Sequence, residues 1–293
     1  MFKKTMKKIA CLALATLSVG VCASTFAGCE TSHPEVEMQI EFNGETYTLE
    51  YKLYRKIAPS TVNHFLYLAE NGYYDGLCVH DYDEDYLRMY TGAYSADETA
   101  EHGLVYKPYY DTVARYDELK AYPTTVWFDK EQNNPSFTVY GEFENNNFKV
   151  KKGALASTYG SLTTYYHDIS SYEEAEERVY VKRADSEGEA TGRSYKYNST
   201  TSMFFISMQE TGSVQAKYCT FATLENTDVL KEFKKDFDAY ISANYGTDED
   251  DFFAEEDVKV CTDDAVIGDH EVVVKYDVPK TPVVIKSVKV TKY

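Results

Sequence analysis

Two short runs of alternating side chains flank the dipeptide Asn43-Gly44. Apolar and polar residues alternate over 38–42 and again over 47–51, a period of two that is typical of a strand with one buried face. Asn-Gly readily takes the positive φ angles that a two-residue hairpin turn requires. The sequence therefore predicts a β-hairpin here. Hydrophobic residues make up 43% of the 293 residues, which is enough to bury a core against this hairpin.

The N-terminal segment has the charge order of an export signal. Four lysines precede an apolar run from Ile9 to about Val21, which is too short to span a membrane comfortably. The run ends in Phe26-Ala27-Gly28-Cys29, which resembles the lipobox of bacterial lipoproteins, where the cysteine is acylated and becomes the mature N-terminus. An ordinary secretory signal or a short membrane span is the alternative. We expect a signal peptide over 1–28, a tether over 29–35 and a folded domain over 36–293, anchored outside the cytoplasm through Cys29.

The charge and the cysteines exclude several classes of function. Loss of the four lysines with the signal takes the formal net charge from −18 to −22, which disfavours nucleic acid or an anionic lipid surface as a partner and leaves a basic client compatible. Of the six cysteines, Cys78, Cys219 and Cys261 remain in the domain without a CxxC pair. We expect no metal and no cofactor.

Periodicity predicts two helices among strands. Residues 57–72 and 227–241 each carry one apolar stripe between helix-starting and helix-ending residues, and Gly72 is placed to take the left-handed conformation after the first helix. Further strands are predicted over 148–155, 202–208, 217–224 and 283–290. Polar or acidic segments without sustained periodicity, at about 93–135, 160–198 and 243–275, are interpreted as insertions.

Seven short motifs, in order, are similar to those of the cyclophilin-type peptidyl-prolyl isomerases. Any one of them would be weak, but their order and spacing agree with the family. They are Ala58-Pro59-Ser60-Thr61-Val62 with Gly72-Tyr73-Tyr74-Asp75-Gly76; Phe137 to Phe143; Gly153-Ala154-Leu155-Ala156; Ser202-Met203-Phe204-Phe205-Ile206; Tyr218 to Leu224; Asp228-Val229-Leu230; and Pro282 to Val288.

The resemblance implies a mainly β fold. This is a closed eight-stranded antiparallel β-barrel capped by two helices, here with three long insertions, and with peptide bound in a groove on the outer face. It also implies proline-containing peptides or exported client proteins as partners, and we expect a monomer.

The resemblance also places a groove on this sequence. Where the family has Phe-His-Arg, and its arginine donates toward the proline nitrogen, this chain has Val79-His80-Asp81, so that an acceptor anion replaces a donor cation. Arg88 lies nearby as a candidate substitute donor, in a segment whose register against the family is ambiguous by one residue. No catalytic residue is assigned. The groove positions are His80, Asp81, Met203, Phe205, Val214 and Tyr218.

Several of these groove residues can also be explained by a purely structural role. Phe205 and Val214 are equally explained by core packing, and His80 by a buried, hydrogen-bonded histidine. We predict an exported, membrane-anchored isomerase-family protein with weak or lost activity. The alternative is a catalytically inactive binding or chaperone module of the cell envelope. A third hypothesis is that tyrosine-lined insertions bind a small ligand or glycan, and it is supported only by the amino-acid composition.

Overall fold

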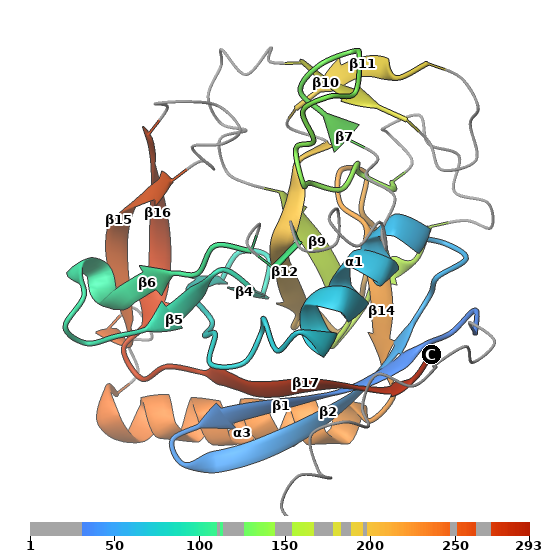
Figure 1. Cartoon of the computed structure of the whole chain (residues 1–293). Coiled ribbons are helices and arrows are strands. Elements are labelled where there is room, and N and C mark those ends of the chain that lie inside the picture. The colour runs from blue at the N-terminus through green and yellow to red at the C-terminus, as the bar shows by residue number, and fades with distance from the viewer. Residues whose placement is uncertain are drawn as a thin grey trace, which may run out of the picture.

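A curled antiparallel sheet forms the centre of the computed structural model (Figure 1). The model describes residues 31–109, 112–113, 126–143, 154–166, 178–182, 189–195, 198–246, 251–261 and 271–293. The predicted signal peptide and Cys29 lie outside these residues, as does most of the predicted strand at 148–155. None of the described helices is both long and apolar enough to cross a membrane.

Eight strands make the central sheet, in the order β17-β1-β2-β14-β9-β12-β4-β3. Their bounds are β1 Glu35–Phe42, β2 Glu45–Leu53, β3 Asp81–Asp83, β4 Arg88–Thr91, β9 Leu162–Tyr166, β12 Thr200–Ser207, β14 Thr220–Leu224 and β17 Val284–Lys292. The helices are α1 Pro59–Glu70 and α3 Thr227–Asn244, with a 3-10 turn η1 at Glu101–Gly103. The smaller strands are β5 Tyr94–Ala96, β6 Leu104–Tyr106, β7 Val126–Trp127, β8 Ala156–Ser157, β10 Arg178–Val181, β11 Thr191–Ser194, β13 Ser213–Val214, β15 Phe253–Cys261 and β16 Glu271–Pro279.

The predicted closed barrel is corrected to a half-barrel. The edge strands β3 and β17 share no continuous ladder. The chain just before β3 meets the start of β17 through an isolated bridge between Cys78 and Val284 and backbone hydrogen bonds beside it. β3 is only three residues long, too short to carry a ladder around to β17.

The N-terminal hairpin is confirmed, and its turn explains its register. Asn43 and Gly44 both have positive φ, 49° and 85°, as a type I′ turn requires. β1 and β2 then pair without a register shift from Phe42 with Glu45 to Glu35 with Lys52. This regular pairing places alternate side chains of both strands in the core.

Both predicted helices are present and cover the sheet. α1 ends before Gly72, which takes φ 64°, and it packs against β17. The buried carboxylate of Glu142 accepts hydrogen bonds from the first amides of α1, Ser60 N at 3.1 Å and Thr61 N at 2.9 Å, which are groups that a helix cannot satisfy internally. α3 packs against β2, and Phe42 meets the rings of Phe233 and Phe237.

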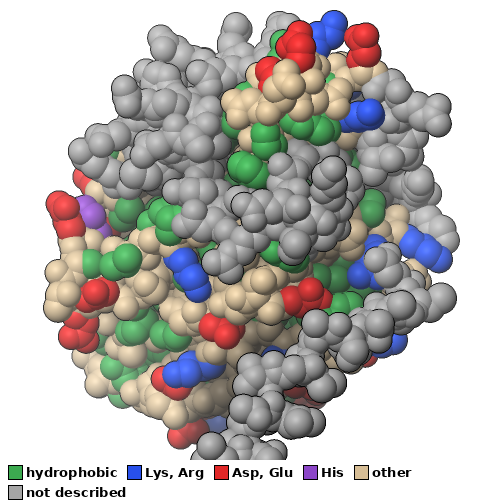
Figure 2. Space-filling view, in the orientation of Figure 1, with side chains coloured by type: hydrophobic (Ala, Val, Ile, Leu, Met, Phe, Trp, Pro, Cys, Tyr) green, Lys and Arg blue, Asp and Glu red, His purple; other side chains and the backbone are tan. Residues whose placement is uncertain are grey.

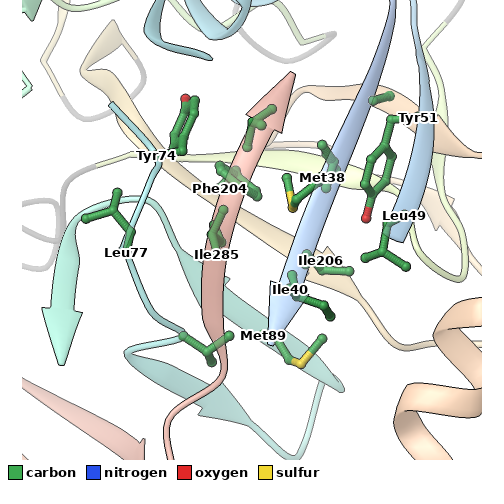
Figure 3. Packing of buried hydrophobic residues seen from close by; sticks show 14 of the residues in the cluster. Met38, Ile40, Leu49, Tyr51, Tyr74, Leu77, Met89, Phe204, Ile206 and Ile285 are labelled. Atoms are coloured by element: carbon green, nitrogen blue, oxygen red, sulfur yellow. The ribbon is translucent and has the colours of Figure 1, made fainter. Parts of the chain in front are cut away.

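One continuous core lies inside the curl and includes residues of both α1 and α3; Figure 3 shows part of it. Met38, Ile40 and Leu49 of the first hairpin face Phe204 and Ile206 of β12, and all five are almost fully buried. The two faces of β12 therefore have different roles. Its even-numbered side chains here build the core, and Phe205 points to the opposite face.

All three of the predicted insertions contain ordered strands. β9 lies within the segment 160–198, yet it is an interior strand between β14 and β12, so this insertion begins later than the sequence suggested. β15 and β16 lie mostly within 243–275 and form a long antiparallel hairpin that stands beside the sheet in Figure 1. Three consecutive acidic residues of β15, Glu255 to Asp257, interrupt the alternation that is typical of a strand. On the face shown in Figure 2, hydrophobic patches lie between scattered acidic and basic side chains, so neither sign of charge dominates there.

Candidate functional site

A row of residues crosses four strands on the outer face of the sheet. Asp81 of β3 pairs with Tyr90 of β4, Tyr90 with Phe205 of β12, and Phe205 with Thr163 of β9. Directly paired residues of neighbouring strands point to the same face. The register therefore brings the predicted groove residues Asp81 and Phe205 to one surface, with Tyr90 between them.

The side chain of Arg88 covers Phe205. Its guanidinium carbon lies 4.6 Å from the ring centre of Phe205 and 4.8 Å from that of Tyr86 on the solvent side. Cation–π contacts of this kind contribute about 0.5–2 kcal/mol each, more when water is excluded. Phe205 is completely buried, and Arg88 is only 9% exposed. A cation thus occupies the space over Phe205 where the resemblance places a proline pocket.

Two neutral oxygens complete the surroundings of Arg88. Its Nη1 donates to the Tyr90 hydroxyl at 3.3 Å and its Nη2 to Gln215 Oε1 at 3.5 Å, both at the long end for hydrogen bonds. Burial raises the pKa of Tyr90, against the opposing effect of Arg88, so this hydroxyl stays protonated. Arg88 is held by rings and two weak hydrogen bonds.

Tyrosine rings continue from Phe205 along this face. Tyr218 lies edge-on to Phe205 with ring centres 5.9 Å apart. Tyr165 stacks on Tyr218 at 5.9 Å and meets Tyr90 at 4.8 Å. Tyr165 and Tyr218 are partly exposed. These rings form a ladder of aromatic surface beside Arg88, a kind of surface that binds extended proline-rich segments in other proteins.

Asp81 has a structural partner on the β15–β16 hairpin. Its Oδ1 accepts a hydrogen bond from the backbone amide of Asp277 at 2.9 Å. In the next position, Tyr82 stacks flat on Phe253, with ring centres 4.9 Å apart and planes 2° from parallel. Asp81, which stands where the family has its arginine, therefore holds the β15–β16 hairpin against the edge of the sheet. A carboxylate in this place donates no hydrogen bond to a proline nitrogen.

His80 and Met203 both pack against the β15–β16 hairpin. His80 is buried between the rings of Tyr94 and Tyr276, and burial lowers its pKa to about 3. Met203 belongs to a buried cluster with Tyr276 and Val258 of the hairpin. Tyr165, which stacks on Tyr218, packs against the same cluster, so these two predicted groove residues lie at the hairpin side of the aromatic rings.

Val214, the fifth predicted groove residue, is exposed to solvent. It lies on β13, next to Gln215, and 45% of its side chain is open to solvent. Tyr86 at 55% and Leu87 at 40% are exposed on the β3–β4 turn. We call Tyr86, Leu87 and Val214 the apolar rim, because they flank the residues that enclose Arg88.

A family model for "Cyclophilin type peptidyl-prolyl cis-trans isomerase/CLD" matches residues 37–260. This chain belongs to the cyclophilin-type peptidyl-prolyl isomerase family. The match runs from β1 into β15 and includes both helices. It confirms the family that the ordered motifs indicated.

Solved structures of cyclophilins are similar to the chain at low identity. A cyclophilin-type peptidyl-prolyl cis-trans isomerase of Cryptosporidium parvum shares 11% identity, with 89% of this chain and 99% of that chain covered and a TM-score of 0.42. The same protein in the presence of the dipeptide Ala-Pro gives 10% identity, coverage of 88% and 99%, and a TM-score of 0.39. A search of curated proteins found no match.

Sequence reasoning missed Tyr90, Tyr165 and Gln215 as members of this site of a cyclophilin. The sequence did contain a signal for Tyr90. This residue lies in the segment around Arg88 that was compared with a family motif, but the alignment to that motif was ambiguous by one residue. Tyr165 lay in a segment interpreted as an insertion. Within the described residues, no three His, Cys, Asp or Glu side chains are grouped to hold a metal ion.

Proposed function

We propose that this chain is an exported, lipid-anchored cyclophilin that binds proline-containing segments of client proteins and has weak or no isomerase activity. Family membership supports the substrate class. The observation that carries the loss of activity is Arg88 lying 4.6 Å over a fully buried Phe205. A prolyl ring reaches Phe205 only by displacing this guanidinium.

Catalysis of proline isomerisation needs a group that favours the twisted amide. The barrier is about 18–20 kcal/mol because resonance makes the C–N bond partly double, and a donor aimed at the proline nitrogen reduces that resonance. Asp81 is an acceptor engaged by Asp277. Arg88 is a donor, but its guanidinium is packed against the rings of Phe205 and Tyr86.

A second candidate, a catalytically inactive binding or chaperone module of the envelope, is supported by the apolar rim. Tyr86, Leu87 and Val214 expose apolar surface next to partly exposed tyrosines, and exposed apolar clusters are typical of binding surfaces. The two candidates differ only in residual catalysis. The deciding experiment is the rate of cis–trans interconversion of a proline peptide, measured while its binding is followed on the same sample.

The proposed lipid anchor has its own test. In a bacterial host, the full chain is expected in the membrane fraction, and the Cys29→Ser variant in the soluble exported fraction, because a serine hydroxyl is not the thiol that is acylated. Cys22→Ser, inside the predicted signal, is the matched control and should leave the chain in the membrane fraction. Equal membrane association of wild type and Cys29→Ser would show that Cys29 is not the anchor.

A further inference from the structure

An acidic hollow of about 650 Å³ opens beside the aromatic ladder. Its lining contains six carboxylate side chains against a single lysine, and that lysine, Lys275, is already paired with Glu255 at 2.7 Å. The hollow therefore carries a strong negative charge. Its lining is Asp81, Asp83, Glu84, Asp85, Tyr90, Tyr165, Phe253, Glu255, Lys275 and Asp277.

Aromatic side chains form part of the wall of this hollow. Tyr90, Tyr165 and Phe253 all line it. Ring faces attract cations, and they also pack against the aliphatic stem of a lysine or arginine. Among the described residues, no three carboxylates are grouped as ligands for a metal ion. The combination of aromatic walls with spaced carboxylates suits a long cationic side chain better than a bare ion.

The hollow and the surface over Phe205 are continuous. Tyr165 belongs to the wall of the hollow and also stacks on Tyr218, which touches Phe205. The β3–β4 turn places Asp85 in the hollow and the next residue, Tyr86, over Arg88. An extended segment that lies on the aromatic ladder therefore passes the mouth of the hollow within a few residues.

The walls are fixed before any ligand arrives. One wall is the β15–β16 hairpin, held through the Asp277 amide to Asp81 and through Phe253 on Tyr82. On the β3–β4 turn, Asp83 Oδ1 accepts the amide of Tyr86 at 2.9 Å. A site that is already ordered loses less entropy on binding.

We propose that the acidic hollow is a specificity subsite for a lysine or arginine close to the proline of the bound segment. The proposal rests on the proposed function and names its substrate class, a basic proline-containing segment. Exposed apolar area on Tyr86, Leu87 and Val214 contacts the segment beside the hollow, and charge complementarity selects which segments bind.

Three capped peptides test the subsite, each with the sequence Gly-Xaa-Ala-Pro-Ala-Xaa-Gly and with Xaa as lysine, glutamine or glutamate. We expect the lysine peptide to bind about tenfold more tightly than the glutamine peptide and the glutamate peptide to bind least, in titrations at low salt. The preference should shrink as the ionic strength rises from about 0.02 M to about 0.5 M.

Two matched triple variants locate the effect. In Asp83→Asn/Glu84→Gln/Asp85→Asn, the preference for lysine should fall to less than about threefold while the glutamine peptide binds as before. The amide oxygen that Asp83→Asn introduces still accepts a hydrogen bond from the Tyr86 amide. The control, Glu45→Gln/Glu50→Gln/Glu232→Gln, removes the same charge from another hollow between β2 and α3 and should keep the preference.

The outcomes separate this inference from the proposed function. Equal affinity for all three peptides would overturn the subsite while leaving proline binding intact. Full lysine preference in the β3–β4 variant would also overturn it, because the selecting charge would lie elsewhere. Binding of none of the peptides would overturn the proposed function and the subsite together.

Discussion

Replacing Arg88 by alanine is expected to raise the affinity for a neutral proline peptide by about tenfold. The guanidinium lies between the rings of Phe205 and Tyr86 and covers Phe205 beside the rings of Tyr90 and Tyr218. At ~25 cal/mol per Å² of apolar surface, contact between a prolyl ring and an uncovered phenyl face is worth on the order of 1.5 kcal/mol, or about tenfold in affinity. Titration with the glutamine peptide measures this without interference from the acidic hollow.

Arg88→Met is the matched control for this effect. Methionine has similar length and still covers Phe205, but it carries no charge. If the side chain at position 88 weakens binding by covering Phe205, Arg88→Met should bind the peptide about as weakly as wild type. If the positive charge weakens binding, both variants should show the same increase in affinity. Thermal unfolding checks that each variant is folded. Weaker binding by Arg88→Ala would show instead that Arg88 holds the peptide directly.

Acid is expected to destabilise the protein steeply between pH 6.5 and about 4.5. Burial lowers the pKa of His64 to about 4 and that of His80 to about 3. Both folded-state pKa values lie below the unfolded value near 6.5, so the stability is present above pH 6.5 and is lost as the unfolded chain takes up protons. Each histidine contributes up to about 1.4 kcal/mol per pH unit, on the order of 4–5 kcal/mol together over this interval.

Urea unfolding at several pH values measures this slope. His80→Phe, which keeps an aromatic ring between Tyr94 and Tyr276, and His64→Gln should each remove about half of it. Glu142 works in the opposite direction, because burial raises its pKa and its contribution grows as the pH falls. An unchanged slope in both histidine variants would show that these side chains are not the buried neutral groups described above.

Local signals in the sequence predicted the frame of this fold. The Asn43-Gly44 turn, the apolar stripe of α1 and that of α3 each fix a structure within a few residues, and all three elements are confirmed. The closed barrel was wrong because closure depends on how far short strands such as β3 extend. No periodicity in a single segment carries that information.

The candidate site was harder to predict, because its residues meet through long-range pairing. Phe205 was identified through its motif. Its cover by Arg88 depends on the β4–β12 register, and the role of Asp81 depends on a hairpin almost 200 residues later in the chain. Val274, Tyr276 and Val278 of β16 alternate with charged residues in the sequence, but this alternation is short and it overlaps a segment interpreted as an insertion.

The rate of isomerisation of the neutral peptide tests the central claim most directly. Exchange between the cis and trans forms of the glutamine peptide, followed by NMR with increasing wild-type protein, should stay within a few-fold of the uncatalysed time of tens to hundreds of seconds, while the shifts of the peptide report binding. The same peptide with alanine in place of proline should bind more weakly. An acceleration on the order of 10⁶-fold, typical of enzymes, would contradict the account.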